Sequence, residues 1–120
     1  MPFDKIPVEG LTHLYFSFGY ISPSGFQIIP MDNQKKSLFA DLTDLKRKNR
    51  ALKTVVAVGG WTFNDNGTDY QPVFSDMVSS VSNRAKFISN LLSFLRENAF
   101  DGVDFDWVRI LRSLQLLCTN

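Results

Sequence analysis

The sequence has few features that would point to secretion, membrane insertion or disulfide bonding. Cys118 is the only cysteine among 120 residues, so the chain cannot form an internal disulfide bond. No run of about 18 apolar residues occurs, which excludes a transmembrane helix at the usual length. Residues 1–10 contain prolines and carboxylates and cannot form the apolar segment of a signal peptide. No signal peptide and no membrane partner are therefore expected in this chain.

The sequence also lacks a strong charge of either sign. Thirteen basic residues stand against twelve acidic ones, a net charge of +1, which favours neither nucleic acid nor an anionic membrane surface as a partner. The only basic run, residues 46–50, falls at the end of a predicted helix, where cations suit the helix dipole. We interpret this run as a solvated helix end rather than a nucleic-acid patch.

Hydrophobic residues make up 44% of the chain and charged residues 21%, as in ordinary globular proteins. Residue types and periodicity predict strands at residues 11–21, 54–59 and 100–107, a short extended piece at 26–30, and helices at 37–50 with Ser37 as cap, 73–80 and 82–98. The last helix carries a predicted apolar stripe of Phe87, Ile88, Leu91, Leu92 and Leu95. Strands alternating with helices predict an α/β fold with a parallel sheet.

An acidic run ends the last predicted strand. Asp101, Asp104 and Asp106 stand between apolar and aromatic residues, although a buried carboxylate needs a partner or a raised pKa. Because side chains alternate along a strand, positions 104, 106 and 108 share one face. An acid at 108 would complete the row, but Val108 occupies it. Taken alone, the run is also compatible with an ordinary acidic turn at the surface.

The context of this run resembles glycoside hydrolase family 18, the chitinase family. The family motif D-G-x-D-x-D-W-E-Y-P is similar to residues 101–107 and departs at residues 108–110, where Val-Arg-Ile stands for Glu-Tyr-Pro. A second family motif, S-x-G-G, resembles residues 57–60 with Ala57 in place of serine. Residues 11–18 and 83–88 also look like family segments, and residues 59–65 look closest to fungal-type chitinases. The resemblance covers residues 6–107.

The resemblance implies part of a (β/α)8 TIM barrel, about its first half, truncated after the catalytic strand. A complete barrel takes about 250 residues, and this chain has 120. Residues 1–107 are therefore predicted to be the N-terminal part of a catalytic domain, and residues 108–120 a non-homologous tail. A retained intron after the Trp107 codon would explain both the lost glutamate and the early stop.

The activity that the resemblance implies is hydrolysis of β-1,4-linked N-acetylglucosamine in chitin, with the substrate supplying the nucleophile. Asp106 would orient the acetamido group and Asp104 would tune the charge of Asp106. Asp101 is expected to serve structure. Because Val108 cannot donate a proton, the chain is predicted to be inactive. The alternatives are an inactive carbohydrate-binding relative and, less favoured, an unrelated small α/β interaction domain.

Other candidate residues divide between binding and packing. Trp61 could serve equally as a sugar platform or as a core residue, and Gly59 and Gly60 are substrate-binding candidates by resemblance. Trp107 is interpreted as core, and His13 as a hydrogen-bonded structural histidine. No cofactor or metal is expected. The parent family is usually exported, and the triplet at residues 66–68 is a glycosylation acceptor sequence.

Overall fold

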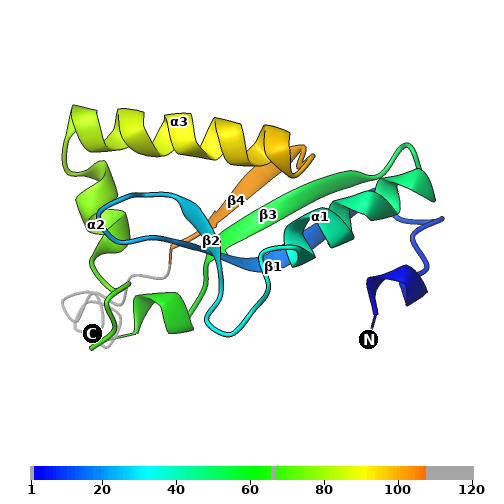
Figure 1. The fold of residues 1–120 in the computed structure, drawn as a ribbon, viewed down its shortest axis with the longest axis horizontal. Helices are drawn as coiled ribbons and strands as arrows, with labels where there is room; N and C mark the ends of the chain where they lie inside the picture. Colours follow the sequence, from blue (N-terminus) through cyan, green and yellow to red (C-terminus); the bar gives the residue numbers. More distant parts are fainter. Residues whose placement is uncertain (1, 66, 108–120) are drawn as a thin grey trace, which may run out of the picture.

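The computed structural model describes residues 2–65 and 67–107, and its centre is a four-stranded sheet (Figure 1). The strands are β1 (His13–Ile21), β2 (Ile28–Pro30), β3 (Lys53–Gly59) and β4 (Gly102–Asp106), in the spatial order β2-β1-β3-β4. β1, β3 and β4 run parallel, whereas β2 returns antiparallel to the last residues of β1. The predicted parallel α/β arrangement is confirmed. β1 and β4 begin two residues later than predicted, at His13 and Gly102, and β3 begins one residue earlier, at Lys53.

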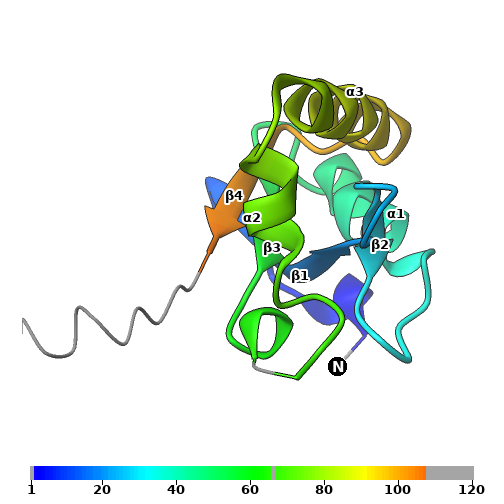
Figure 2. The same cartoon turned by 90° about the vertical axis from the view of Figure 1, so that its left-hand side faces the viewer.

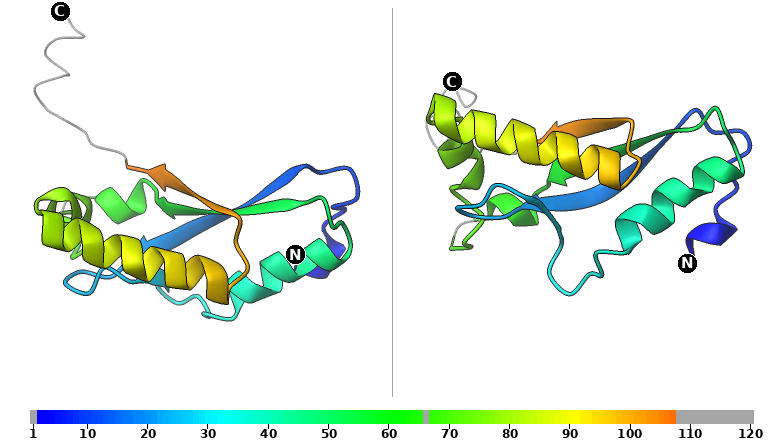
Figure 3. Two further views of the ribbon diagram at one scale, coloured as in Figure 1. Left: turned by 90° about the horizontal axis from the view of Figure 1, so that it is seen from above. Right: turned by 45° about the horizontal axis from the view of Figure 1, so that its top comes forward.

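Helices α1 and α3 cover one face of this sheet (Figures 2 and 3). The helical segments are η1 (Phe3–Lys5), α1 (Leu38–Thr43), η2 (Asp44–Arg47), η3 (Thr62–Asn64), α2 (Val73–Val78) and α3 (Val81–Glu97). Between helices and sheet lies an aromatic core, in which the ring of Phe39 contacts those of Phe16, Phe94 and Phe100. Val56 and Val58 of β3 are fully buried against it. Burial of these apolar side chains holds the two layers together.

The opposite face of the sheet is largely open to solvent. Tyr15 of β1 is 51% exposed, and Ser17 and Asp104 are exposed as well. Alternation along each strand explains the difference, since Leu14 and Phe16 point to the helices while Tyr15 and Ser17 point away. The open face is therefore the more polar one.

The helix starting near position 37 differs from its prediction. The side chain of Ser37 makes no capping hydrogen bond, and the α-helix ends at Thr43. The chain then tightens into the 3₁₀ segment η2, which ends at Arg47 rather than Arg50. A short helix followed by a tighter turn keeps Leu42 and Leu45 buried although the α-helical repeat stops between them.

The apolar stripe predicted for α3 was partly wrong. Phe87, Leu91 and Phe94 are the buried residues, whereas Ile88 and Leu92 are 53% and 46% exposed. The sheet covers a narrow stripe at spacings of four and three residues, so positions one residue further round the helix face solvent. The helix is capped by Ser80, whose hydroxyl accepts a hydrogen bond from the Asn83 N–H at 3.0 Å.

Candidate functional site

The parallel strands β1, β3 and β4 end at the same edge of the sheet, and the acidic run lies on the last of them. Register pairs Asp104 with Ala57 and Asp106 with Gly59. Residues two apart on a strand share a face, so both carboxylates belong to the open face of the sheet. Asp104 is exposed and Asp106 is partly buried. Position 108, where the sequence lacks the expected acid, lies outside the described residues.

Two glycines bring the end of β4 against the end of β3. The N–H of Gly60 donates a hydrogen bond to the carbonyl oxygen of Asp106 at 3.0 Å. Gly59 has φ +110°, and a Cβ there would lie 2.4 Å from that same oxygen. Gly60 has φ +91°, and a Cβ added there would lie 3.1 Å from a ring carbon of Phe18. Only glycine combines this backbone conformation with this close approach.

Trp61 follows these glycines and is 60% exposed, which excludes the core interpretation. Its backbone starts η3, where the Asn64 N–H donates to the Trp61 carbonyl at 3.1 Å. The Asn64 side chain also donates to the Gly60 carbonyl at 2.9 Å. The exposed indole therefore stands on a hydrogen-bonded turn at the carboxyl edge of the sheet. A large exposed ring on an ordered support is suited to stacking on an apolar ligand face.

Trp107 only partly fulfils the core prediction. It is 37% exposed, and one face of its indole stacks on Phe74 of α2, with ring centroids 5.2 Å apart and an interplanar angle of 21°. Phe74 could not be predicted as a site residue, because the sequence of a short amphipathic helix does not indicate which strand end its aromatic residue will contact.

Asp101 stands apart from the other two acids and anchors the start of β4. Its carboxylate accepts a hydrogen bond from the Thr54 N–H at 2.8 Å and pairs with Lys46 Nζ at 2.7 Å. Burial alone would raise the pKa of Asp101, but the hydrogen bond from Lys46, the bond from the Thr54 N–H and nearby positive charge together lower it. The predicted structural role of Asp101 is confirmed by these contacts.

His13 lies far from this edge, at the amino-terminal end of β1. It is exposed, and its Nδ1 lies 3.1 Å from the Thr12 hydroxyl oxygen. The predicted hydrogen bond exists, but the expected apolar surroundings do not, because His13 alternates onto the open face. His13 therefore does not join the two acids.

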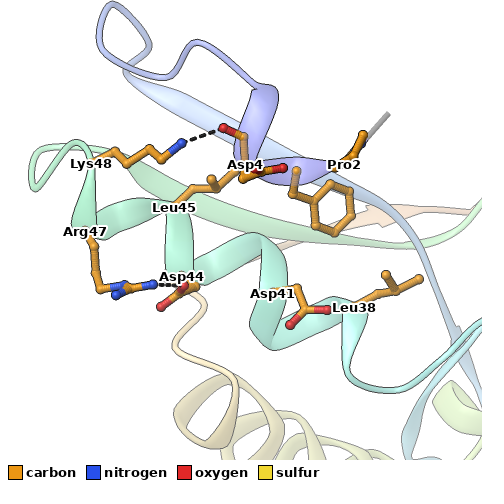
Figure 4. Close-up of a pocket in the computed structure, with 9 residues that line it drawn as sticks. Pro2, Asp4, Leu38, Asp41, Asp44, Leu45, Arg47 and Lys48 are labelled. Atoms are coloured by element: carbon orange, nitrogen blue, oxygen red, sulfur yellow. Dashed lines mark hydrogen bonds and ion pairs between the residues drawn. The ribbon is translucent and has the colours of Figure 1, made fainter.

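The basic run makes local contacts near the amino-terminal ends of the strands. Lys46 pairs with Asp101, as described above. Arg47 pairs with Asp44, and Lys48 Nζ donates a hydrogen bond to the Asp4 carbonyl oxygen at 2.5 Å (Figure 4). Lys46 and Arg47 end the helical segment η2, as predicted, whereas residues 48–50 follow its end. Arg47 and Lys48 border a pocket of about 600 Å³, which is lined by Pro2, Phe3, Asp4, Leu38, Asp41, Asp44, Leu45, Arg47 and Lys48. The η1 segment, which supplies Phe3 and Asp4 to this lining, lies at the opposite end of the sheet from the tip of β4 (Figure 1).

Within residues 2–65 and 67–107, no group of histidine, cysteine and carboxylate side chains has the arrangement of a metal site. Across the same ranges, no helix combines the length and hydropathy that a membrane span requires.

Comparison with known sequences shows which protein family the chain matches. The family model of glycosyl hydrolases family 18 matches residues 2–110. Chitotriosidase-1 of Mus musculus is 44% identical over 96 residues, covering 80% of this chain and 19% of that protein. Oviduct-specific glycoprotein of Bos taurus is 44% identical over 94 residues, covering 78% of this chain and 16% of that protein. The chain thus spans less than a fifth of each relative. These mammalian proteins do not confirm the fungal-type resemblance.

Solved structures agree with the fold. A family 18 chitinase of Cycas revoluta, a mutant in complex with (GlcNAc)4, matches with a TM-score of 0.74 and 26% identity over 98% of this chain and 33% of that one. Human YKL-39, described as a pseudo-chitinase with retained chitooligosaccharide binding, matches with a TM-score of 0.65 and 33% identity over 80% of this chain and 24% of that one. The prediction of a partial TIM barrel is confirmed by these matches.

Proposed function

Because this chain belongs to glycosyl hydrolases family 18, we propose that it is the N-terminal part of a chitinase catalytic domain. In this proposal its edge of the sheet binds N-acetylglucosamine oligosaccharides, and the chain as given does not hydrolyse them. The observation that carries the proposal is the contact between the Gly60 N–H and the Asp106 carbonyl. This contact brings an exposed tryptophan and the acidic strand end to one edge of the sheet. Stacking platforms and carboxylates at one edge suit a ligand with apolar ring faces and polar substituents.

Each acid has a role in this proposal. Asp106, paired in register with Gly59, would accept the N–H of the substrate acetamido group and hold its carbonyl oxygen toward the anomeric carbon. Asp104 lies two residues earlier on the same face, so its charge raises the free energy of a second charge on Asp106.

The missing step is protonation of the leaving oxygen. Position 108 carries valine, and the nearby Arg109 and Arg112 stay protonated at any working pH. General acid catalysis typically contributes about 10² to 10⁴ in rate, so its absence leaves trace turnover at best. The chain would position a sugar without cleaving it.

A chitin-binding protein without catalysis is the second candidate. It is favoured by the exposure of Trp61, which needs no catalytic acid to be useful, together with valine at 108. The relative described as a pseudo-chitinase with retained chitooligosaccharide binding supports the same reading by analogy. For the parent protein we also propose export, in keeping with the family resemblance.

Hydrolysis and binding are tested separately. The 120-residue chain and Val108→Glu are incubated with a fluorogenic chitobiose glycoside, and neither is expected to release the fluorophore. The single substitution restores the acid but not the loops from other strands that build the cleft of a complete barrel. Clear turnover by the unmodified chain would contradict the interpretation of position 108, and turnover by Val108→Glu would contradict the need for further strands.

Binding is measured by titrating chitotetraose while following tryptophan fluorescence and, independently, heat. We expect Trp61→Ala to weaken binding about tenfold, or ~1.4 kcal/mol, since aromatic stacking contributes about this much. Ile88→Ala is the matched control, because it also removes an exposed apolar side chain but lies on α3. Equal losses in both variants, or no detectable binding by the unmodified chain, would contradict the proposed function.

A further inference from the structure

Phe74, on α2, reaches the junction where β3 and β4 end. It is 1% exposed, and its Cε2 lies 3.0 Å from the position that a Cβ would take on Gly59. The same ring stacks on Trp107, directly after β4. α2 lies beside the ends of both strands (Figure 2). One buried ring therefore contacts the backbone junction next to Asp106 and the residue that follows it.

Phe74 also contacts the segment that carries Trp61. Its ring meets that of Phe63 edge to face, with centroids 5.3 Å apart and an interplanar angle of 70°. Phe63 is fully buried and belongs to η3, the turn that begins at Trp61. Through Phe63, the position of this turn depends on where the Phe74 ring lies.

We propose that Phe74 is a positioning residue that fixes Asp106 and Trp61 relative to each other, so that one sugar chain can contact both. This proposal rests on the proposed function of the edge as a sugar site. Closely packed rings transmit a displacement because little free volume can absorb it. Gly59 and Gly60 have the least steric restraint on their backbone. Loss of the Phe74 ring would therefore be relieved by movement at these glycines, where the Trp61 turn begins and where the Asp106 carbonyl is hydrogen-bonded.

Phe39 provides a matched comparison within the same hydrophobic core. It is fully buried, and its ring contacts Phe94 of α3 and Phe100, which precedes β4. Its partners thus lie toward the opposite end of β4. Removing either ring opens a cavity in the core, but only the Phe74 cavity adjoins Gly59 and Trp107. A purely structural role would make the two positions equivalent.

The experiment compares Phe74→Leu, Phe74→Met and Phe39→Leu in the full chain. Backbone amide resonances of Gly60 and Asp106 and the indole resonance of Trp61 are recorded without sugar, together with urea unfolding. We expect both Phe74 variants to shift these three resonances while Phe39→Leu leaves them near their original positions, at a comparable loss of stability. Phe74→Met is included in case Phe74→Leu does not fold, because the flexible methionine side chain can fill more of the cavity. Equal shifts in the Phe74 and Phe39 variants would overturn the proposal.

Chitotetraose titration separates this inference from the proposed function. If the unmodified chain binds the sugar, Phe74→Leu is expected to weaken binding about tenfold and Phe39→Leu less than twofold; equal weakening would overturn the positioning role. If the unmodified chain does not bind, the proposed sugar site fails, and the resonance shifts alone decide whether Phe74 positions the two segments.

Discussion

At the scale of single residues, the carboxyl edge of the sheet requires glycine at two neighbouring positions. Gly59 and Gly60 lack a Cβ where the backbone of β4 approaches, and their positive φ values suit no other residue equally well. By resemblance, the sequence made these glycines substrate-binding candidates. It could not indicate that the backbone of Asp106 approaches them, because that contact joins strands separated by more than forty residues.

Gly59→Ala tests this close approach. The new Cβ would lie 2.4 Å from the Asp106 carbonyl oxygen, so the end of β4 would have to move. The alanine itself would also have to adopt an unfavourable positive φ. Backbone strain of this kind costs about 1–3 kcal/mol, and we expect the collision to bring the total loss in unfolding free energy above ~3 kcal/mol. Urea denaturation followed by circular dichroism measures it.

Gly67→Ala is the matched control, because Gly67 also has positive φ, +82°, but an added Cβ there meets no atom within 4 Å. This variant carries the strain without the collision. A similar loss of stability in both variants would show that backbone approach is not what position 59 requires.

At the scale of elements, β4 is fixed at both ends by different means. At its start, Asp101 bridges Thr54 and Lys46, and at its end the Asp106 carbonyl accepts from Gly60. The sequence predicted the type and approximate position of the strands and the long helix correctly, because their apolar periodicity is strong. It misjudged the α3 stripe and the end of α1, since how much of a helix is covered depends on the sheet it meets rather than on its own period.

Asp101→Asn should weaken the anchor at the start of β4. The folded-state pKa of Asp101 is lowered, so the carboxylate stabilises the fold above its unfolded pKa of about 3.9, and that contribution disappears as pH falls through the lower folded value. We expect the variant to lose ~1 kcal/mol at pH 6, given partial solvent screening, and we expect this difference to shrink at pH 3, which lies below the unfolded pKa. Urea midpoints at both pH values provide the measurement.

Asp41→Asn serves as control, since Asp41 is an exposed carboxylate on α1. If the stability difference between the chain and Asp101→Asn were the same at pH 6 and pH 3, the ionised anchor would be refuted.

At the scale of the whole molecule, apolar side chains remain exposed outside the core. Ile88 and Leu92 lie one turn apart on α3, and Phe105 of β4, also exposed, has its ring 6.0 Å from that of Phe87. Exposed apolar area beside a strand edge favours association between chains.

The 120-residue chain is therefore expected to self-associate as its concentration rises, with a growing sedimentation coefficient. Ile88→Glu with Leu92→Glu should suppress this association by placing charges on the apolar strip. Ser89→Glu with Ser93→Glu adds the same two charges at the same spacing to exposed polar positions of α3 and is the control. A concentration-independent monomer, or equal suppression by both pairs, would contradict the prediction.

The order of the strands has a consequence for how the protein emerges during synthesis. β2 pairs with β1, β3 with β1, and β4 with β3, so every strand joins one that was translated before it. The sheet can therefore grow strand by strand behind the ribosome, without waiting for a partner from the far end of the chain. Among the strands that the structure describes, β4 is translated last, and it joins an edge that β3 has already formed.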